Sequence, residues 1–165
     1  MNKIINNWNY NGVQYKFTWY PDIDPETINP VTQCYGFCYN DKGKLLVIET
    51  SMPGRWQVPG GTVEEDETFE QTLRREIIEE ANVTIKDIHY LGAQSVQNNK
   101  NDEVIYQLRF AARIDKLCER EPDPDKGKIL ERKLINPLTY NELAGWGPIG
   151  DELVRLSMEK LGFLK

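Results

Sequence analysis

Hydrophobic and polar residues alternate over several stretches of the chain, and this alternation predicts a protein rich in β-strands. Aromatic and aliphatic residues occupy every second position from Val13 to Trp19, and the preceding Asn11-Gly12 pair is typical of a two-residue hairpin turn. Residues 1–20 are therefore expected to form an N-terminal β-hairpin. Its aromatic face must pack against something: we expect the main core, with a second subunit of a homodimer as the alternative.

The rest of the chain alternates between strand-like and helix-like patterns. Strands are expected over residues 33–39, 45–49, 55–58, 84–95, 103–114 and 129–135. Helices are expected over residues 68–81 and 148–161, and the capping-box pair Thr68 and Gln71 places the start of the first at Phe69. We expect a single α/β domain over residues 1–165 with a mixed β-sheet and two main helices.

Composition and charge restrict the classes of function. The chain has 165 residues, of which 39% are hydrophobic and 28% charged, as in soluble globular proteins. Its net charge is −6 and it lacks a basic stripe, which argues against binding to a nucleic acid duplex. Without an apolar run of about 20 residues or a secretion signal, no membrane association is expected and the cytoplasm is the expected compartment.

The cysteines and the single histidine predict neither a disulfide nor a zinc site. Cys34 and Cys38 lie four apart in an expected strand, about 13 Å from each other, which is too far for a disulfide. Buried free thiols are the expected state. His89 has no second histidine or cysteine pair nearby in the sequence, so a zinc site is not expected.

Three glutamates cluster on one side of the first expected helix. Glu76, Glu79 and Glu80 fall within about a 100° arc at i, i+3 and i+4 spacing, beside the apolar stripe that should face the core. Carboxylates at this spacing repel one another, and partial burial increases the cost. A hard divalent cation such as Mg²⁺, which prefers oxygen ligands, would relieve it. A solvated acidic helix face is the alternative from the helix alone.

The segment before this helix strengthens the metal interpretation. Gly60 and Gly61 are expected in a tight turn, where adjacent glycines let backbone groups approach a ligand closely. The pattern Gly61-x5-Glu67-x7-Arg75-Glu76-Ile77-x-Glu79-Glu80-x-Asn82-Val83 closely resembles the Nudix box, with six polar or glycine positions matching. Six fixed matches arise by chance about once in 10⁷ starting positions. The lead-in Trp56-Gln57-Val58-Pro59-Gly60-Gly61 is also similar to that of the family.

This resemblance implies a fold, an activity and a set of site residues. The implied fold is the Nudix α/β/α sandwich with a mixed β-sheet, over one hydrolase domain. The implied activity is hydrolysis of a nucleoside diphosphate linked to another moiety. It depends on Mg²⁺, with Mn²⁺ as a substitute. The implied metal ligands are Glu76, Glu79 and Glu80 with the Gly61 carbonyl, while Arg75 and Glu67 form a supporting ion pair.

One position departs from the family pattern, because Asn82 stands where the box has its last glycine. This residue follows the helix and is expected in a left-handed conformation, which asparagine adopts more readily than most residues. Little functional loss is expected, since every metal-binding acid of the box is present.

The resemblance leaves the general base and the substrate open. The base is one of the box glutamates or an acid from a later segment, for which Glu131, also a candidate metal ligand, and Glu103 are considered. Tyr35, Phe37 and Trp56 are candidates for contacting the substrate base, with core packing as the alternative. Nucleoside triphosphates, ADP-ribose, dinucleoside polyphosphates and nucleotide sugars all remain candidate substrates. The alternative function is a nucleotide-sensing module with little turnover.

Overall fold

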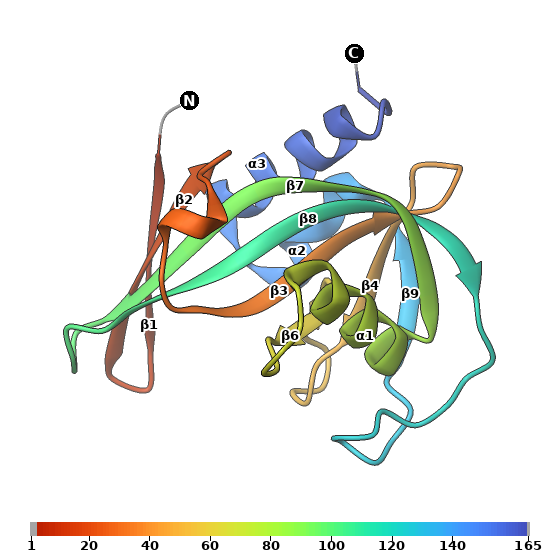
Figure 1. Cartoon of the computed structure of the whole chain (residues 1–165), viewed down its shortest axis with the longest axis horizontal. Helices are drawn as coiled ribbons and strands as arrows, with labels where there is room; N and C mark the ends of the chain where they lie inside the picture. The colour runs from red at the N-terminus through yellow and green to blue at the C-terminus, as the bar shows by residue number, and fades with distance from the viewer. Residues whose placement is uncertain (1–2, 165) are drawn as a thin grey trace.

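The computed structural model of the chain describes residues 3–164 and consists of one large mixed β-sheet with helices on both faces (Figure 1). The strands run in the order β1-β2-β7-β8-β3-β4-β5, with β6 paired to β3 and β9 paired to β4. β3 and β8 are parallel and the other pairs antiparallel. The strands are β1 (Ile4–Tyr10), β2 (Val13–Pro21), β3 (Val31–Tyr39), β4 (Leu45–Glu49), β5 (Trp56–Gln57), β6 (Gly60–Thr62), β7 (Val83–Asn98), β8 (Val104–Leu117) and β9 (Arg132–Ile135).

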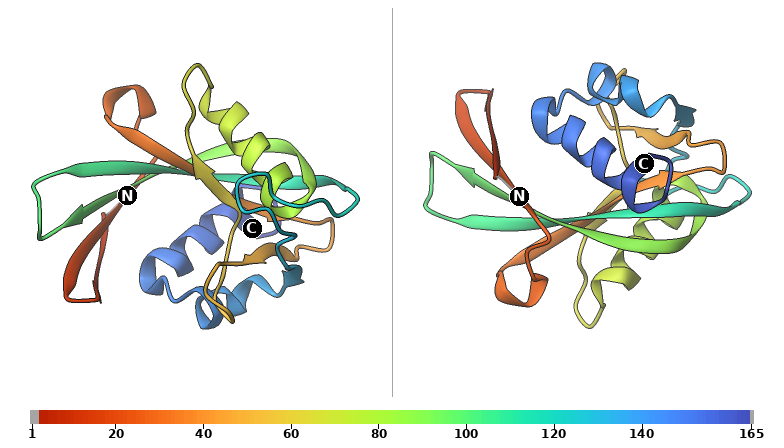
Figure 2. Two further views of the ribbon diagram at one scale, coloured as in Figure 1. Left: turned by 90° about the horizontal axis from the view of Figure 1, so that it is seen from below. Right: turned by 90° about the horizontal axis from the view of Figure 1, so that it is seen from above.

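The helices form two layers on either side of this sheet, which confirms the predicted α/β/α arrangement. The helices are α1 (Phe69–Ala81), α2 (Tyr140–Ala144) and α3 (Gly147–Lys160), with short 3-10 turns η1 (Pro25–Thr27) and η2 (Pro137–Thr139). Figure 2 shows α1 and α3 on opposite sides of the long β7–β8 ribbon. Among residues 3–164, no helix is both long enough and apolar enough to cross a bilayer.

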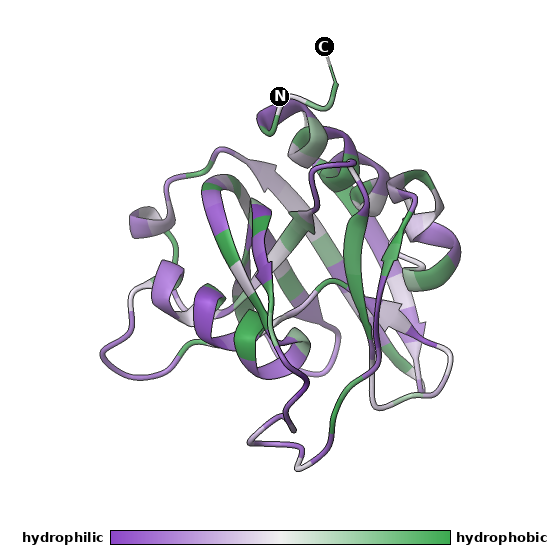
Figure 3. Cartoon of the chain, turned by 90° about the vertical axis from the view of Figure 1, so that its right-hand side faces the viewer, coloured by the Kyte–Doolittle hydropathy of each residue, from purple (hydrophilic) through white to green (hydrophobic). Residues whose placement is uncertain are grey.

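Two hydrophobic clusters fill the space between the sheet and its helices, and alternation along β3 assigns residues to each. Cys34 and Cys38 point to the α1 side, where they are fully buried free thiols, as predicted. Phe37 and Tyr39 point to the side of α2 and α3. Figure 3 shows hydrophobic residues concentrated on the strands and more polar ones on the outer turns of the helices.

The N-terminal hairpin forms as predicted and continues the sheet. Asn11 and Gly12 have φ values of 49° and 75°, as a tight hairpin turn between twisted strands requires. β2 pairs with β7, so the hairpin belongs to the same sheet. Phe17 and Trp19 are buried in the core, whereas Trp8 and Tyr10 on the edge strand remain exposed. The aromatic face is therefore divided between core packing and solvent.

Two predictions need correction. Gly60 and Gly61 lie in β6, paired with β3, and not in a turn. They are needed because β6 passes so close to its neighbours that a Cβ at Gly60 would overlap the carbonyl oxygen of Cys34. The short helix α2 was not predicted, because its five residues are too few to show a helical period. The bounds of β7, β8 and β9 also differ from the predicted ranges by up to three residues.

Candidate active site

Helix α1 begins and ends as the sequence predicts, and this fixes the direction of its acidic side chains. Thr68 accepts from the backbone N–H of Gln71, and the Gln71 side chain accepts from the N–H of Thr68, completing the capping box. At the other end Asn82 adopts the left-handed conformation with φ 51° and ψ 53°. Its side chain donates to the Ile78 carbonyl and accepts from the Glu121 N–H, contacts that a glycine could not make.

The three glutamates of α1 differ in burial. Glu76 and Glu80 are 8% and 4% exposed, whereas Glu79 is half-buried. Burial raises the pKa of both Glu76 and Glu80 above the usual range of a carboxyl group, and neighbouring acids add to the effect. Two buried carboxylates on one helix face are typical of a site that binds cations.

The backbone of β6 lies directly against these carboxylates. The N–H of Gly60 donates to Oε2 of Glu80 over 2.9 Å. A Cβ added at Gly61 would lie 2.5 Å from the carboxylate atoms of Glu76, so only glycine leaves room for that side chain. The carboxylates of α1 are thus packed directly against the main chain of β6.

Arg75 links the loop before α1 to the acidic face. Its Nε and Nη2 donate to the two carboxylate oxygens of Glu67 over 2.7 and 3.0 Å, so the expected ion pair is present and bidentate. Its Nη1 lies 3.0 Å from Glu76 and 3.2 Å from Glu79. The same guanidinium also donates to the Thr62 carbonyl at the end of β6. Arg75 therefore fixes the position of both glutamates relative to β6.

A second cation, which was not predicted, reaches the site from the loop between β8 and β9. Nζ of Lys126 lies 2.5 Å from Oε1 of Glu80 and 3.3 Å from Oδ2 of Asp123. Asp123 is only 3% exposed and also accepts from the N–H groups of Asp125 and Lys126. This loop is rich in charged residues with proline and glycine, and such a composition carries no periodic signal that would predict a site.

The oxygen donors present at this site are of the chemical type that a hard cation prefers. Carboxylate and main-chain carbonyl oxygens are the ligands that Mg²⁺ prefers, and Mn²⁺ accepts them too. Within the part of the chain that the structure describes, however, no three His, Cys, Asp or Glu side chains converge closely enough to hold a metal ion. Arg75 and Lys126 instead neutralise the glutamates. A cation entering here would take over the role of Lys126 at Glu80.

The other predicted residues lie in different environments. The backbone of Tyr35 pairs with Gly60 across β3 and β6, and its side chain packs on the α2 and α3 side of the sheet. Phe37 is 1% exposed and packs edge-on against Tyr140, with ring centroids 5.5 Å apart. Trp56 on β5 is partly buried, and Nζ of Lys133 lies 3.8 Å above its ring centre.

The two outside candidates for the general base are both exposed. Glu103 lies in the β7–β8 turn, where it accepts from the Asn101 side chain. That turn is at the opposite end of β8 from Leu117, the residue that pairs with Val83 just after α1. Glu131 precedes β9, and its main-chain carbonyl accepts from Glu49.

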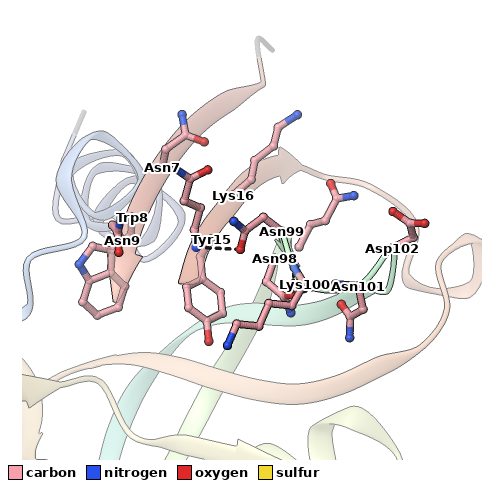
Figure 4. Close-up of a pocket in the computed structure, with 12 residues that line it drawn as sticks. Asn7, Trp8, Asn9, Tyr15, Lys16, Asn98, Asn99, Lys100, Asn101 and Asp102 are labelled. Carbon is pink, nitrogen blue, oxygen red and sulfur yellow. Dashed lines mark hydrogen bonds between the residues drawn. The ribbon is translucent and has the colours of Figure 1, made fainter. Parts of the chain in front are cut away.

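A larger depression lies away from the acidic face. It has a volume of about 670 Å³ and opens between the N-terminal hairpin and the β7–β8 turn (Figure 4). Its wall consists mostly of asparagine, glutamine, lysine and aromatic side chains and includes no residue of α1 or β6. The chemistry of the acidic face is therefore independent of this depression.

Comparison with known proteins identifies the family. The model of the NUDIX domain family matches residues 32–155. YtkD of Bacillus subtilis (strain 168), which is named for 8-oxo-dGTP diphosphatase activity, is 32% identical over 121 residues, or 72% of this chain and 73% of YtkD. The phosphatase NudJ of Escherichia coli (strain K12) is 29% identical over 84 residues, which are 49% of this chain and 54% of NudJ.

Solved structures agree on the fold. The Bacillus subtilis pyrophosphohydrolase BsRppH superposes with a TM-score of 0.67 at 24% identity, over 96% of both chains. A C. elegans Ap4A hydrolase superposes with a TM-score of 0.53 at 20% identity, over 80% of this chain and 99% of that one. From the family match, the related sequences and the acidic helix beside a glycine strand, we conclude that the chain belongs to the NUDIX domain family and is a pyrophosphohydrolase of nucleotide-linked anhydrides.

Proposed function

We propose that α1 and β6 form the metal and diphosphate site of this hydrolase, and that its substrate is a nucleoside triphosphate. The observation that carries the proposal is the pair of buried carboxylates, Glu76 and Glu80, packed against the main chain of Gly60 and Gly61. The size of substrate follows from YtkD, which is named for hydrolysis of a nucleoside triphosphate and matches most of this chain.

In this proposal each residue of the site has a separate role. Glu76, Glu79 and Glu80 would hold Mg²⁺, or Mn²⁺ in its place, together with the carbonyl of Gly61. The bound cation would neutralise the diphosphate and polarise its phosphoryl oxygens. Arg75, held by Glu67, keeps Glu76 and Glu79 directed toward β6. Because Arg75 touches the ligands and not the substrate in this arrangement, it is a positioning residue.

The reaction that fits these roles is attack of water on a phosphorus of the triphosphate. A P–O bond forms from the water oxygen to the α- or β-phosphorus as the anhydride P–O bond of the α–β bridge breaks, and the water proton passes to a carboxylate of the site. We assign the proton acceptor to the α1 carboxylates. Glu103 lies at the end of β8 far from α1, and Glu131 is exposed. The products are a nucleoside monophosphate and pyrophosphate.

The test is turnover of a nucleotide panel with purified protein, with pyrophosphate and phosphate release measured after EDTA treatment and addition of Mg²⁺ or Mn²⁺. We expect Glu79→Gln and Glu80→Gln to lower kcat/KM about a hundredfold or more, because metal-assisted charge stabilisation contributes several kcal/mol. Glu70→Gln is the matched control: this glutamate is exposed on the same helix and pairs with Arg74. Full activity of both site variants would refute the metal assignment, and saturable binding without release would favour a nucleotide sensor.

A further inference from the structure

The face of the sheet opposite α1 contains a small polar cavity that the Nudix box does not explain. It has a volume of about 70 Å³, room for several water-sized atoms. Its walls come from β3, β7, β8, the segment before β6, and helices α2 and α3. Three of its polar side chains, those of Gln94, Gln107 and Arg109, come from the long β7–β8 pair.

Arg109 is buried in this wall without an acidic partner. It is 4% exposed, and no carboxylate of the described residues forms an ion pair with it. Its Nη2 donates to the Gln107 side chain over 2.8 Å, and its Nη1 makes a longer bond of 3.3 Å to the Leu108 carbonyl. Its Cζ lies 4.6 Å from the ring centre of Tyr35. A guanidinium has five N–H donors, so most of its capacity is unused at a place where burying a charge is costly.

Gln94 is a second polar group without a partner in the same cavity. It is 0% exposed, and neither its Nε2 nor its Oε1 has a hydrogen-bond partner. It faces Gln107 across β7 and β8, and Gln107 in turn donates to Gln33 on β3. Buried amides are nearly always hydrogen-bonded. An amide without hydrogen-bond partners, in the same cavity as a guanidinium that has unused donors and no carboxylate partner, favours a ligand that completes both.

The cavity adjoins the acidic face across one strand pair. Tyr35, which lies under Arg109, pairs with Gly60, and the N–H of Gly60 binds Glu80. Val58 in the cavity wall is two residues before Gly60. A nucleotide that keeps its diphosphate at the acidic face and its base at Arg109 must therefore pass around β6, which among the described strands pairs only with β3. The volume admits the polar edge of a base and excludes a whole nucleoside.

We propose that Arg109 and Gln94 recognise the edge of a 6-oxopurine base, as in guanine and hypoxanthine, and so select the nucleotide. Arginine pairs in a bidentate manner with O6 and N7 of guanine, both of which are acceptors. Adenine presents an amino donor in place of O6, and a donor facing a guanidinium is repelled. A phosphate in this cavity would present acceptors alone and leave Oε1 of Gln94 unpaired. A 6-oxopurine also offers the N1–H donor that this oxygen needs.

This inference rests on the proposed function. It also predicts that the protein distinguishes unmodified from oxidised guanine nucleotides. Oxidation of guanine at C8 places a hydrogen on N7 and turns that acceptor into a donor. A bidentate contact from Arg109 to O6 and N7 therefore favours unmodified dGTP over 8-oxo-dGTP. This preference is opposite to the activity for which the relative YtkD is named.

The test measures binding and turnover separately. Binding of GMP, IMP and AMP to the wild-type protein in EDTA, followed by calorimetry, requires no metal chemistry and no variant. We expect GMP and IMP to bind about ten- to a hundredfold more tightly than AMP, the range that one bidentate arginine–base pair supplies. The kcat/KM values for dGTP, dATP and 8-oxo-dGTP in Mg²⁺ should then rank with dGTP first.

Two variants test whether the cavity is responsible for the preference for dGTP over dATP. Arg109→Gln should remove the preference for dGTP over dATP, since glutamine pairs well with adenine. Arg113→Gln is the matched control on the same strand. Arg113 donates to the carbonyl of Leu161 at the end of α3 and lines no part of the cavity. Equal binding of GMP and AMP by the wild type, or preference for 8-oxo-dGTP, would overturn the inference even with full turnover. Absence of turnover for every nucleotide would overturn the proposed function, and the binding comparison would still decide the inference.

Discussion

The two faces of the sheet carry buried charges of opposite sign at almost the same position along β3. On the α1 face, buried carboxylates outnumber the cations, and Arg75 and Lys126 neutralise them from inside the protein. On the other face, one buried cation, Arg109, has no carboxylate partner among the described residues. The acidic site is thus internally satisfied, and the cavity is not.

This difference has a consequence for how each site binds a ligand. A cation that enters the acidic site must displace or move an existing partner, so its binding free energy is reduced by the ion pairs that it breaks. A base edge that enters the cavity adds hydrogen bonds to Gln94, which has none, and to the unused donors of Arg109, and it breaks no ion pair. We therefore expect metal affinity to be tunable by mutations of the protein's own cations, and base selectivity to be lost when Arg109 is replaced.

Among the variants that compare the two faces, the largest effect is expected from adding a single methyl group to the acidic site. In Gly61→Ala the new Cβ would lie 2.5 Å from the Glu76 carboxylate and force it out of place. A displacement of about 1 Å at a catalytic group can lower the rate on the order of a hundredfold, and we expect kcat to fall by that factor. Base selectivity, measured as the ratio of GMP to AMP binding in EDTA, should be unchanged.

The double variant Gly61→Ala, Glu76→Ala provides the control for this substitution. It removes the side chain that the new methyl group contacts. Urea unfolding should show the double variant less destabilised than the sum of the two single variants. Wild-type kcat in Gly61→Ala would mean that the position of Glu76 against β6 does not matter for catalysis.

The α1 site could be predicted from the sequence because its acidic residues lie on consecutive turns of one helix. The spacing of Glu76, Glu79 and Glu80 fixes their common face whatever the rest of the fold does. The left-handed Asn82 was predicted from its place after the helix and the Arg75–Glu67 ion pair from the resemblance to the Nudix box, and both are present. Their functional roles remain proposals.

The cavity could not be predicted, because its polar groups meet only through strand register. Arg109 alternates with Leu108 and Phe110 in β8, a pattern typical of a strand with one solvated face. Only the packing of α2 and α3 over that face buries it. The glycine pair at Gly60 was misassigned to a turn for a related reason: the sequence signal for close backbone approach within a strand is the same as that for a tight turn.

A smaller effect is expected from removing the internal cation of the acidic site. Lys126→Met takes away the ammonium group that pairs with Glu80 and Asp123 and leaves those two acids without it. The Mg²⁺ concentration for half-maximal activity should fall on the order of fivefold, because a partly exposed ion pair contributes about 1 kcal/mol. Lys128→Met in the same loop is the control, since this exposed lysine makes no ion pair within residues 3–164. If Lys126→Met needed a higher Mg²⁺ concentration for half-maximal activity than the control, Lys126 would assist binding of the metal and not compete with it.

The smallest effect distinguishes the two faces by their response to acid. Hydrogen bonds from Arg75, and then from the Thr72 hydroxyl, lower the pKa of Glu67 from 4.5 to about 2. Because the folded pKa lies below the unfolded one, Glu67 contributes its full stabilisation above about pH 4.5 and loses it as the pH falls toward 2. The free energy of unfolding of Glu67→Gln should therefore differ most from the wild type above pH 5 and converge with it near pH 2, as measured by urea denaturation across this range. No Asp or Glu lines the cavity, so the corresponding difference for Gln94→Leu should stay constant over the same window. Parallel pH profiles for the two variants would mean that Glu67 and Arg75 do not stabilise the loop before α1 in the folded state.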